Sequence, residues 1–113
     1  MKEPIRCILW KSPELVEPAA VRFEPVATYD DTNHWSRALL KCRECGQLYF
    51  YEFYEQTDWD CGDDPQSTYI PIETEAEIET LKSQPPLGLL QFVPRLQKDF
   101  PKNAKTPHIG WIR

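Results

Sequence analysis

A two-cysteine turn that leads directly into an aromatic run is the feature that most constrains the fold of this chain. Cys42 and Cys45 are separated by two residues and followed by Gly46, and residues 48–54 are rich in aromatic side chains that favour strands. Two cysteines at this spacing can present both sulfurs to one metal ion, while glycine adopts the positive φ that a tight turn requires. The sequence therefore predicts a central β-hairpin over residues 36–55 whose tip is a cysteine knuckle.

Further strands are predicted on both sides of this hairpin. Residues 47–55 carry apolar side chains at both odd and even positions, which is typical of a strand covered on both faces. Residues 67–72 continue the antiparallel arrangement, and residues 107–113 have the pattern of an edge strand. We also expect a short strand over residues 5–10. Prolines at positions 13, 18 and 25 predict an extended linker from residue 12 to residue 26.

Helices are expected only after residue 73. The Thr74-Glu75-Ala76-Glu77 sequence is a capping box, in which the threonine hydroxyl and the glutamate carboxylate satisfy backbone N–H groups at a helix start. This helix must end before Pro85, a second short helix can begin at Pro86, and the spacing of Leu96 and Phe100 suggests one more helical turn. We predict an α+β fold: one domain over residues 1–113, an antiparallel sheet of three to five strands, and one or two short helices after residue 73.

The composition is that of an ordinary folded domain. Of the 113 residues, 41% are hydrophobic and 27% are charged, so the chain has enough apolar surface to form a core. There is no signal-peptide pattern at the amino terminus and no apolar run near the ~20 residues that span a bilayer. We therefore expect a soluble cytoplasmic protein, in which cysteines are thiols or metal ligands rather than disulfides.

The knuckle resembles those of zinc ribbons and rubredoxin-like sites, in which two strands meet at paired cysteines and turn amides donate to the sulfurs. A full ribbon has a second cysteine pair, whereas here only Cys61 follows the knuckle and Cys7 precedes it. One interpretation is a closed, structural zinc site; the other is a metal-free knuckle stabilised by hydrogen bonds. His34 and His108 are further possible ligands. The expected zinc ligands are four sulfurs: Cys7, Cys42, Cys45 and Cys61.

The longer run CRECGQLYFYEFYE, which begins at the knuckle, is similar to that of small uncharacterised bacterial proteins. This resemblance implies a bacterial origin and no particular activity.

The charges are segregated along the chain. Between Glu44 and Leu81 there are eleven acidic residues and no lysine or arginine, within a net charge of −5. An acidic, aromatic surface repels nucleic acid and attracts basic proteins. We therefore hypothesise a non-enzymatic module that binds a basic protein, for example an immunity protein that neutralises a basic toxin. The residues expected to form this surface are Glu52, Tyr54, Glu55, Asp58, Trp59, Asp60, Asp63 and Asp64.

Two other functions stay open at this point. The first is a zinc-ribbon-like adaptor with structural zinc, and the second is an enzyme whose site the sequence does not reveal. A thioredoxin-like redox role is disfavoured because its reactive cysteine stands at a helix N-terminus, whereas a predicted strand follows this knuckle. The aromatic run could stack single-stranded bases, but it lacks the lysines and arginines that accompany such faces.

Overall fold

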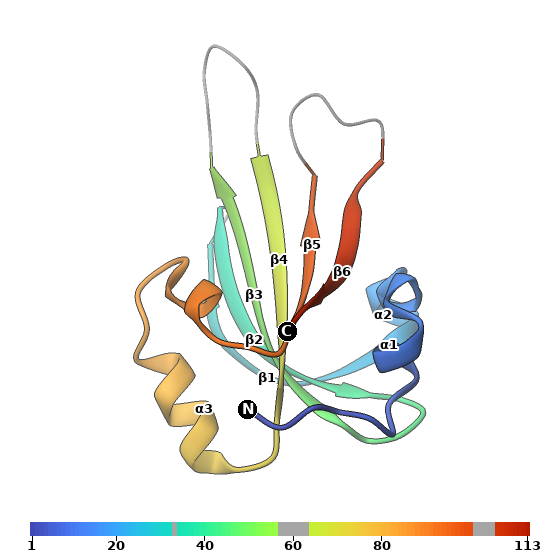
Figure 1. Cartoon of the computed structure of the whole chain (residues 1–113). Helices are drawn as coiled ribbons and strands as arrows, with labels where there is room; N and C mark the ends of the chain where they lie inside the picture. The colour runs from blue at the N-terminus through green and yellow to red at the C-terminus, as the bar shows by residue number, and fades with distance from the viewer. Residues whose placement is uncertain (33, 57–63, 101–105) are drawn as a thin grey trace.

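The computed structural model describes residues 1–32, 34–56, 64–100 and 106–113. Within these ranges the chain forms an antiparallel sheet of six strands in which each strand pairs with the next one along the sequence (Figure 1). The strands are β1 (Phe23–Asp31), β2 (Trp35–Cys42), β3 (Leu48–Gln56), β4 (Asp64–Ile72), β5 (Arg95–Asp99) and β6 (His108–Ile112). The fold is therefore α+β with an antiparallel sheet, as predicted, but the sheet has more strands than the three to five expected.

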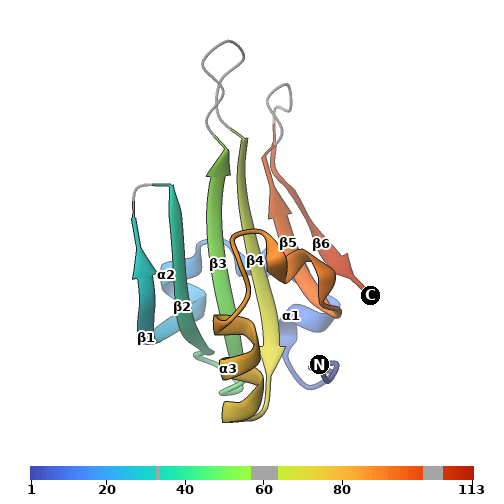
Figure 2. The same cartoon turned by 90° about the vertical axis from the view of Figure 1, so that its left-hand side faces the viewer.

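Short helices cover the two faces of this sheet (Figure 2). On one face lie α1 (Ile8–Lys11), the 3-10 helix η1 (Pro13–Val16) and α2 (Ala19–Arg22). On the other lie α3 (Glu75–Lys82) and the 3-10 helix η2 (Gly88–Gln91). The chain begins on the α3 side, where Met1 packs against the core, and then crosses to the opposite face before α1 (Figure 1).

Each face of the sheet contributes to its own hydrophobic cluster, because alternate side chains of a strand point in opposite directions. In β3, Tyr49 points to the face covered by the amino-terminal helices and Phe50 to the face covered by α3, and neither side chain is exposed. This confirms β3 as a strand covered on both sides. The first cluster comprises Cys7, Leu9, Val16, Phe23, Cys42, Tyr49, Tyr69 and Leu96; the second comprises Leu39, Phe50, Ile70, Ile72, Leu81 and Leu89.

The hairpin and the helix after residue 73 form where the sequence placed them. Strands β2 and β3 pair in a regular antiparallel register from Trp35 opposite Tyr54 to Lys41 opposite Leu48. At the start of α3 the complete capping box is present. These elements depend on local signals, namely turn residues, capping residues and alternation, which a sequence expresses directly.

The prediction for residues 5–26 was wrong. Residues 5–10 contain helix α1 rather than a strand, and the expected linker contains η1, α2 and the beginning of β1. So few residues cannot distinguish a period of 2 from a period of 3.6. The prolines are accommodated where proline is tolerated: Pro13 begins η1, Pro18 precedes α2, and Pro25 lies in the edge strand β1 next to a register shift.

The predicted helical turn around Leu96 and Phe100 was also wrong. Residues 95–99 form β5, in which Leu96 lies opposite Tyr69 of β4 and opposite Trp111 of β6. Leu96 is fully buried, whereas Phe100 is 39% exposed, so the two residues do not form one apolar helical face. Pairing with β4 and β6 determines the conformation of residues 95–99. The four-residue spacing between Leu96 and Phe100 carries no information about that pairing.

A buried ion pair connects the centre of the sheet to the segment between α3 and η2. Arg37 in β2 and Glu52 in β3 lie opposite each other, and each is 1% exposed. The Nε of Arg37 donates to Oε2 of Glu52 at 2.7 Å. The guanidinium also donates to the carbonyl oxygens of Gln84 at 2.6 Å and Pro85 at 2.9 Å, while Oε1 of Glu52 accepts from the backbone N–H of Leu87 at 3.2 Å. Both charges are thus paired within the fold.

We predict that Arg37→Leu lowers the free energy of unfolding by about 3–5 kcal/mol, because it leaves the Glu52 carboxylate buried without a partner. Urea denaturation followed by circular dichroism measures this loss. The double variant Arg37→Leu/Glu52→Leu should recover part of it. Glu79→Gln is the matched control, since it breaks only the exposed pair with Lys82 and should cost less than about 1 kcal/mol. An Arg37→Leu variant as stable as the control would contradict the prediction.

We predict that Thr74→Ala destabilises the protein by about 1 kcal/mol, because the threonine hydroxyl accepts from the N–H of Glu77 at the start of α3. Thr80→Ala is the control, since its exposed hydroxyl donates to a carbonyl oxygen inside the same helix and caps neither end. The same urea titration compares the two variants, and equal losses would argue against a capping role.

Candidate metal centre

Three of the four cysteines lie together at the turn between β2 and β3. The sulfurs of Cys7, Cys42 and Cys45 all lie within 4.8 Å of one another. Cys7 and Cys42 are buried, at 3% and 0% exposed, while Cys45 is exposed. Three sulfurs at this separation are close enough to bind one metal ion. Cys61, the fourth expected ligand, lies outside the described residues, in the segment between Gln56 and Asp64, and these two residues pair at the end of β3 remote from the knuckle.

The turn itself positions two of these sulfurs. Cys42 ends β2, and its N–H and carbonyl groups bond to Gln47 and Gly46, each at 2.9 Å, which closes the turn around Cys45. Gly46 has φ +80°, the left-handed conformation that glycine adopts without a steric penalty. Neither Cys42 nor Cys45 stands at a helix N-terminus, because Leu48 begins β3 directly after the turn.

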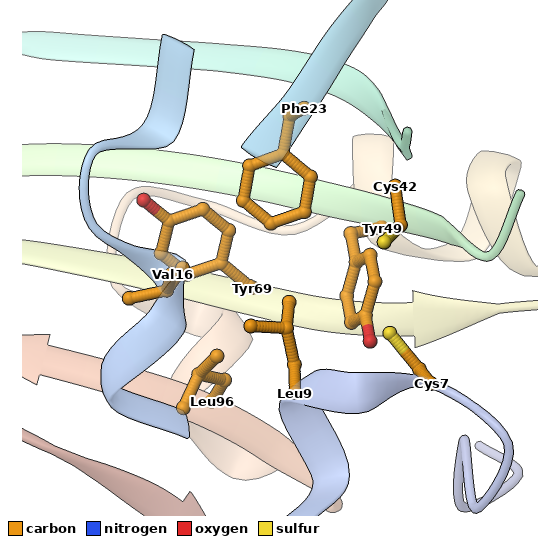
Figure 3. Close-up of a cluster of buried hydrophobic side chains, with 8 residues drawn as sticks. All are labelled: Cys7, Leu9, Val16, Phe23, Cys42, Tyr49, Tyr69 and Leu96. Atoms are coloured by element: carbon orange, nitrogen blue, oxygen red, sulfur yellow. The ribbon is translucent and has the colours of Figure 1, made fainter. Parts of the chain in front are cut away.

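The third sulfur arrives from the amino-terminal segment. Cys7 immediately precedes α1, and its side chain points toward Tyr49 and Cys42 (Figure 3). Other contacts help to fix this segment. The indole N–H of Trp111 donates to the Leu9 carbonyl at 2.7 Å, and the backbone N–H of Arg43, in the knuckle, donates to the Arg22 carbonyl at 3.0 Å.

The environments of the two buried thiols differ. Burial raises the pKa of Cys7 to about 12. Burial also acts to raise the pKa of Cys42, but the backbone N–H groups of Cys45 and Glu44 donate to its sulfur and lower the pKa below its ordinary value. Backbone donors that favour a thiolate at Cys42 agree with the resemblance to metal knuckles, in which turn amides donate to the sulfurs.

Tyr49 adds a polar group to this centre that sequence reasoning missed. It lies in β3, and its hydroxyl points toward the sulfur of Cys7 (Figure 3). The tyrosine is 0% exposed, and its hydroxyl is close enough to the Cys7 sulfur to influence the pKa of both groups, but no contact among the described residues has the geometry of a formed hydrogen bond. Burial raises its pKa, so the phenol keeps its proton. The aromatic run predicted a core position for Tyr49, but nothing local in the sequence indicates that Cys7 lies beside its hydroxyl.

The two histidines do not join the cysteine group. His34 is exposed, and its Nδ1 lies 3.1 Å from Oε1 of Glu55. His108 is exposed at the start of β6, opposite Asp99 in β5. His108 and Asp99 line the same shallow depression, but the Asp99 carboxylate accepts a hydrogen bond from the side chain of Gln97. These pairs do not form a catalytic arrangement that could be assigned to a reaction class.

The structure corrects one member of the proposed acidic surface. Glu52 is 1% exposed and pairs with Arg37, so a partner protein cannot reach it. Tyr54 and Glu55 are partly buried, and Glu55 contacts His34. Of the remaining residues, Asp64 begins β4, and Asp58, Trp59, Asp60 and Asp63 lie outside the described residues. Binding of a basic protein at this surface stays a prediction.

Comparison with protein-family models, with curated proteins and with solved structures gives no match for this chain. Among the described residues, no helix has the length and apolar character needed to cross a membrane.

We predict that Cys45 reacts with iodoacetamide at least tenfold faster than Cys7 and Cys42 in the folded, metal-free protein, because it alone of these three is exposed. Peptide mapping by mass spectrometry reports each cysteine separately. In denaturant the three rates should converge. Equal labelling of Cys7 and Cys45 in the folded protein would contradict the burial of Cys7.

Proposed function

We propose that this protein is a non-enzymatic zinc-binding protein whose metal ion connects its amino-terminal segment to the central hairpin. One observation carries the proposal: the sulfur of Cys7 lies within 4.8 Å of both knuckle sulfurs, although 35 positions separate residues 7 and 42. A hairpin tip requires only its own two cysteines. A third sulfur, that of Cys7 from the amino-terminal segment, lies with them, and three clustered sulfurs are typical of a metal-binding site.

The donor atoms favour zinc over harder metals. Calcium and magnesium prefer oxygen ligands, whereas thiolates suit zinc, copper(I) and iron–sulfur chemistry. Zinc in structural sites binds four ligands in a tetrahedron, often with four sulfurs. Cys7, Cys42 and Cys45 supply three of the four. Gln56 and Asp64, which flank the segment that contains Cys61, pair at the end of β3 remote from the knuckle, about 27 Å from Leu48 at 3.4 Å per residue, which is too far for Cys61 to complete the site. A fourth ligand from outside this group of sulfurs would complete the tetrahedron.

The amino-terminal segment needs such a connection. Helices α1, η1 and α2 have four residues each, and helices so short are unstable in isolation. These three helices contribute few buried apolar side chains to the hydrophobic cluster on their face of the sheet, chiefly Leu9 and Val16. A zinc ion bound by Cys7 and the knuckle would bind only the folded arrangement, so its binding free energy would stabilise the docked amino-terminal segment.

The competing interpretation is a metal-free knuckle. The backbone hydrogen bonds of the turn involve Cys42, Gly46 and Gln47 and need no metal. Cysteine can also be buried as a small apolar residue, which would account for Cys7 alone. This interpretation gives no reason for three sulfurs to meet, and it makes a different prediction about metal content.

We predict that protein purified without chelator contains one zinc ion per chain, measured by elemental analysis. Cys7→Ser, Cys42→Ser and Cys45→Ser should each lower the zinc content to well below half, since each removes a thiolate ligand. Cys61→Ser should leave the zinc content unchanged, because Gln56 and Asp64, on either side of its segment, lie at the end of β3 remote from the knuckle. Removal of zinc by a chelator should lower the melting temperature and should expose residues 1–22 to proteolysis before the sheet, because metal binding contributes to folding.

Ser12→Ala is a matched control, because it changes a small polar residue of the same segment that supplies no sulfur. It should keep full zinc content. Wild-type protein with substoichiometric zinc, or with zinc unaffected by all three cysteine substitutions, would refute the proposal.

A further inference from the structure

The hydroxyl of Tyr49 is the one buried side-chain oxygen or nitrogen without a hydrogen-bond partner in the described part of the chain. Other buried polar side chains are paired, as Arg37 is with Glu52, and as Thr68 is with Gln97 at 3.0 Å. A buried hydroxyl without a partner costs about 1–3 kcal/mol. Phenylalanine would fill the same space without that cost, so the hydroxyl calls for an explanation.

Its position supplies one. Tyr49 and Cys7 belong to the same buried cluster, and the hydroxyl points toward the Cys7 sulfur (Figure 3). A neutral thiol is only a weak acceptor. A sulfur that binds a metal is a thiolate, which carries negative charge, and hydrogen bonds to charged acceptors are roughly twice as strong as neutral ones. The hydroxyl therefore lacks a good acceptor in the metal-free protein and gains one when Cys7 binds a metal.

We propose that Tyr49 is a positioning residue of the metal centre, whose O–H donates to the Cys7 thiolate when the metal is bound. This inference rests on the proposed zinc function. In metal sites, hydrogen-bonded groups behind the ligands orient them and tune the metal. The donor arises from β3, whereas the ligand arises from the amino-terminal segment, so the bond also links these two parts of the chain at the site.

The proposal makes opposite predictions for the two states of the protein. In the metal-free state, Tyr49→Phe removes an unpaired hydroxyl and should leave the stability unchanged or raise it. In the metal-bound state, it removes a charge-assisted hydrogen bond and should weaken zinc affinity by about tenfold. A residue that serves only packing would change both states in the same direction.

The experiment compares wild-type protein, Tyr49→Phe and a control, Tyr51→Phe. Tyr51 lies on the same face of β3 two residues further along, and its ring packs against that of Tyr69. Urea denaturation of chelator-treated protein gives the metal-free stability, and competition with a chromophoric chelator gives the zinc affinity. Cobalt(II) replaces zinc as a spectroscopic probe. Loss of the hydrogen bond should shift the sulfur-to-cobalt charge-transfer band to longer wavelength only in Tyr49→Phe.

The possible results distinguish failure of the proposed zinc function from failure of the proposed role of Tyr49. If wild-type protein binds neither zinc nor cobalt(II), the proposed function fails and this inference fails with it. If wild-type and Tyr49→Phe bind zinc equally and have the same cobalt spectrum, the zinc function stands and the role of Tyr49 is refuted. Lower stability of metal-free Tyr49→Phe at unchanged affinity would also refute it, as would a change in cobalt coordination number, which would make Tyr49 a direct ligand.

Discussion

The ion pair between Arg37 and Glu52 is the interaction on which the α3 side of the structure depends. Two charges at the centre of a sheet are stable there only if every strong donor and acceptor is satisfied. The guanidinium achieves this by donating to carbonyl oxygens in the segment after α3, and the carboxylate by accepting from the indole of Trp35 and from the Leu87 N–H. Leu87 has a left-handed backbone conformation, with φ 66°, which its hydrogen bond to Glu52 helps to stabilise. The pair thus determines where the segment between α3 and η2 lies on the sheet.

The opposite face has a different kind of connection. The amino-terminal helices are shorter than α3, and the ion pairs that fix them, Arg22 with Glu44 and Lys98 with Glu17, lie nearer the surface. Exposed pairs contribute little to stability. On this face, the proposed metal ion between Cys7 and the knuckle would hold the amino-terminal segment against the sheet. The buried ion pair does the same for the segment after α3 on the other face. Strand β3 contributes to both connections, because Tyr49 and Glu52 point to opposite faces of the same strand.

This arrangement changes the expected location of function. The acidic segment suggested a surface for a basic partner, but Glu52, one of its eleven acidic residues, is part of the core. Formal charge along a sequence does not distinguish a carboxylate that faces solvent from one that faces an arginine across a hairpin. The register of the hairpin does: in a regular β2–β3 pairing, Arg37 and Glu52 are direct neighbours. Opposite charges at facing positions of a hairpin covered on both faces are the signal that sequence reasoning could have used.

The sequence by itself determined the local elements: the hairpin around the Cys42 turn, the covered strand β3, the capped start of α3 and the edge strand β6. Each follows from a pattern within a few residues, where turn chemistry, capping and alternation act. Only the tertiary structure decided that Cys7 lies beside Cys42 and Cys45, that the Tyr49 hydroxyl points toward Cys7, and that residues 95–99 form a strand. These outcomes depend on contacts between segments far apart in the chain. No local pattern encodes such contacts, because the burial that stabilises them exists only once the sheet has formed.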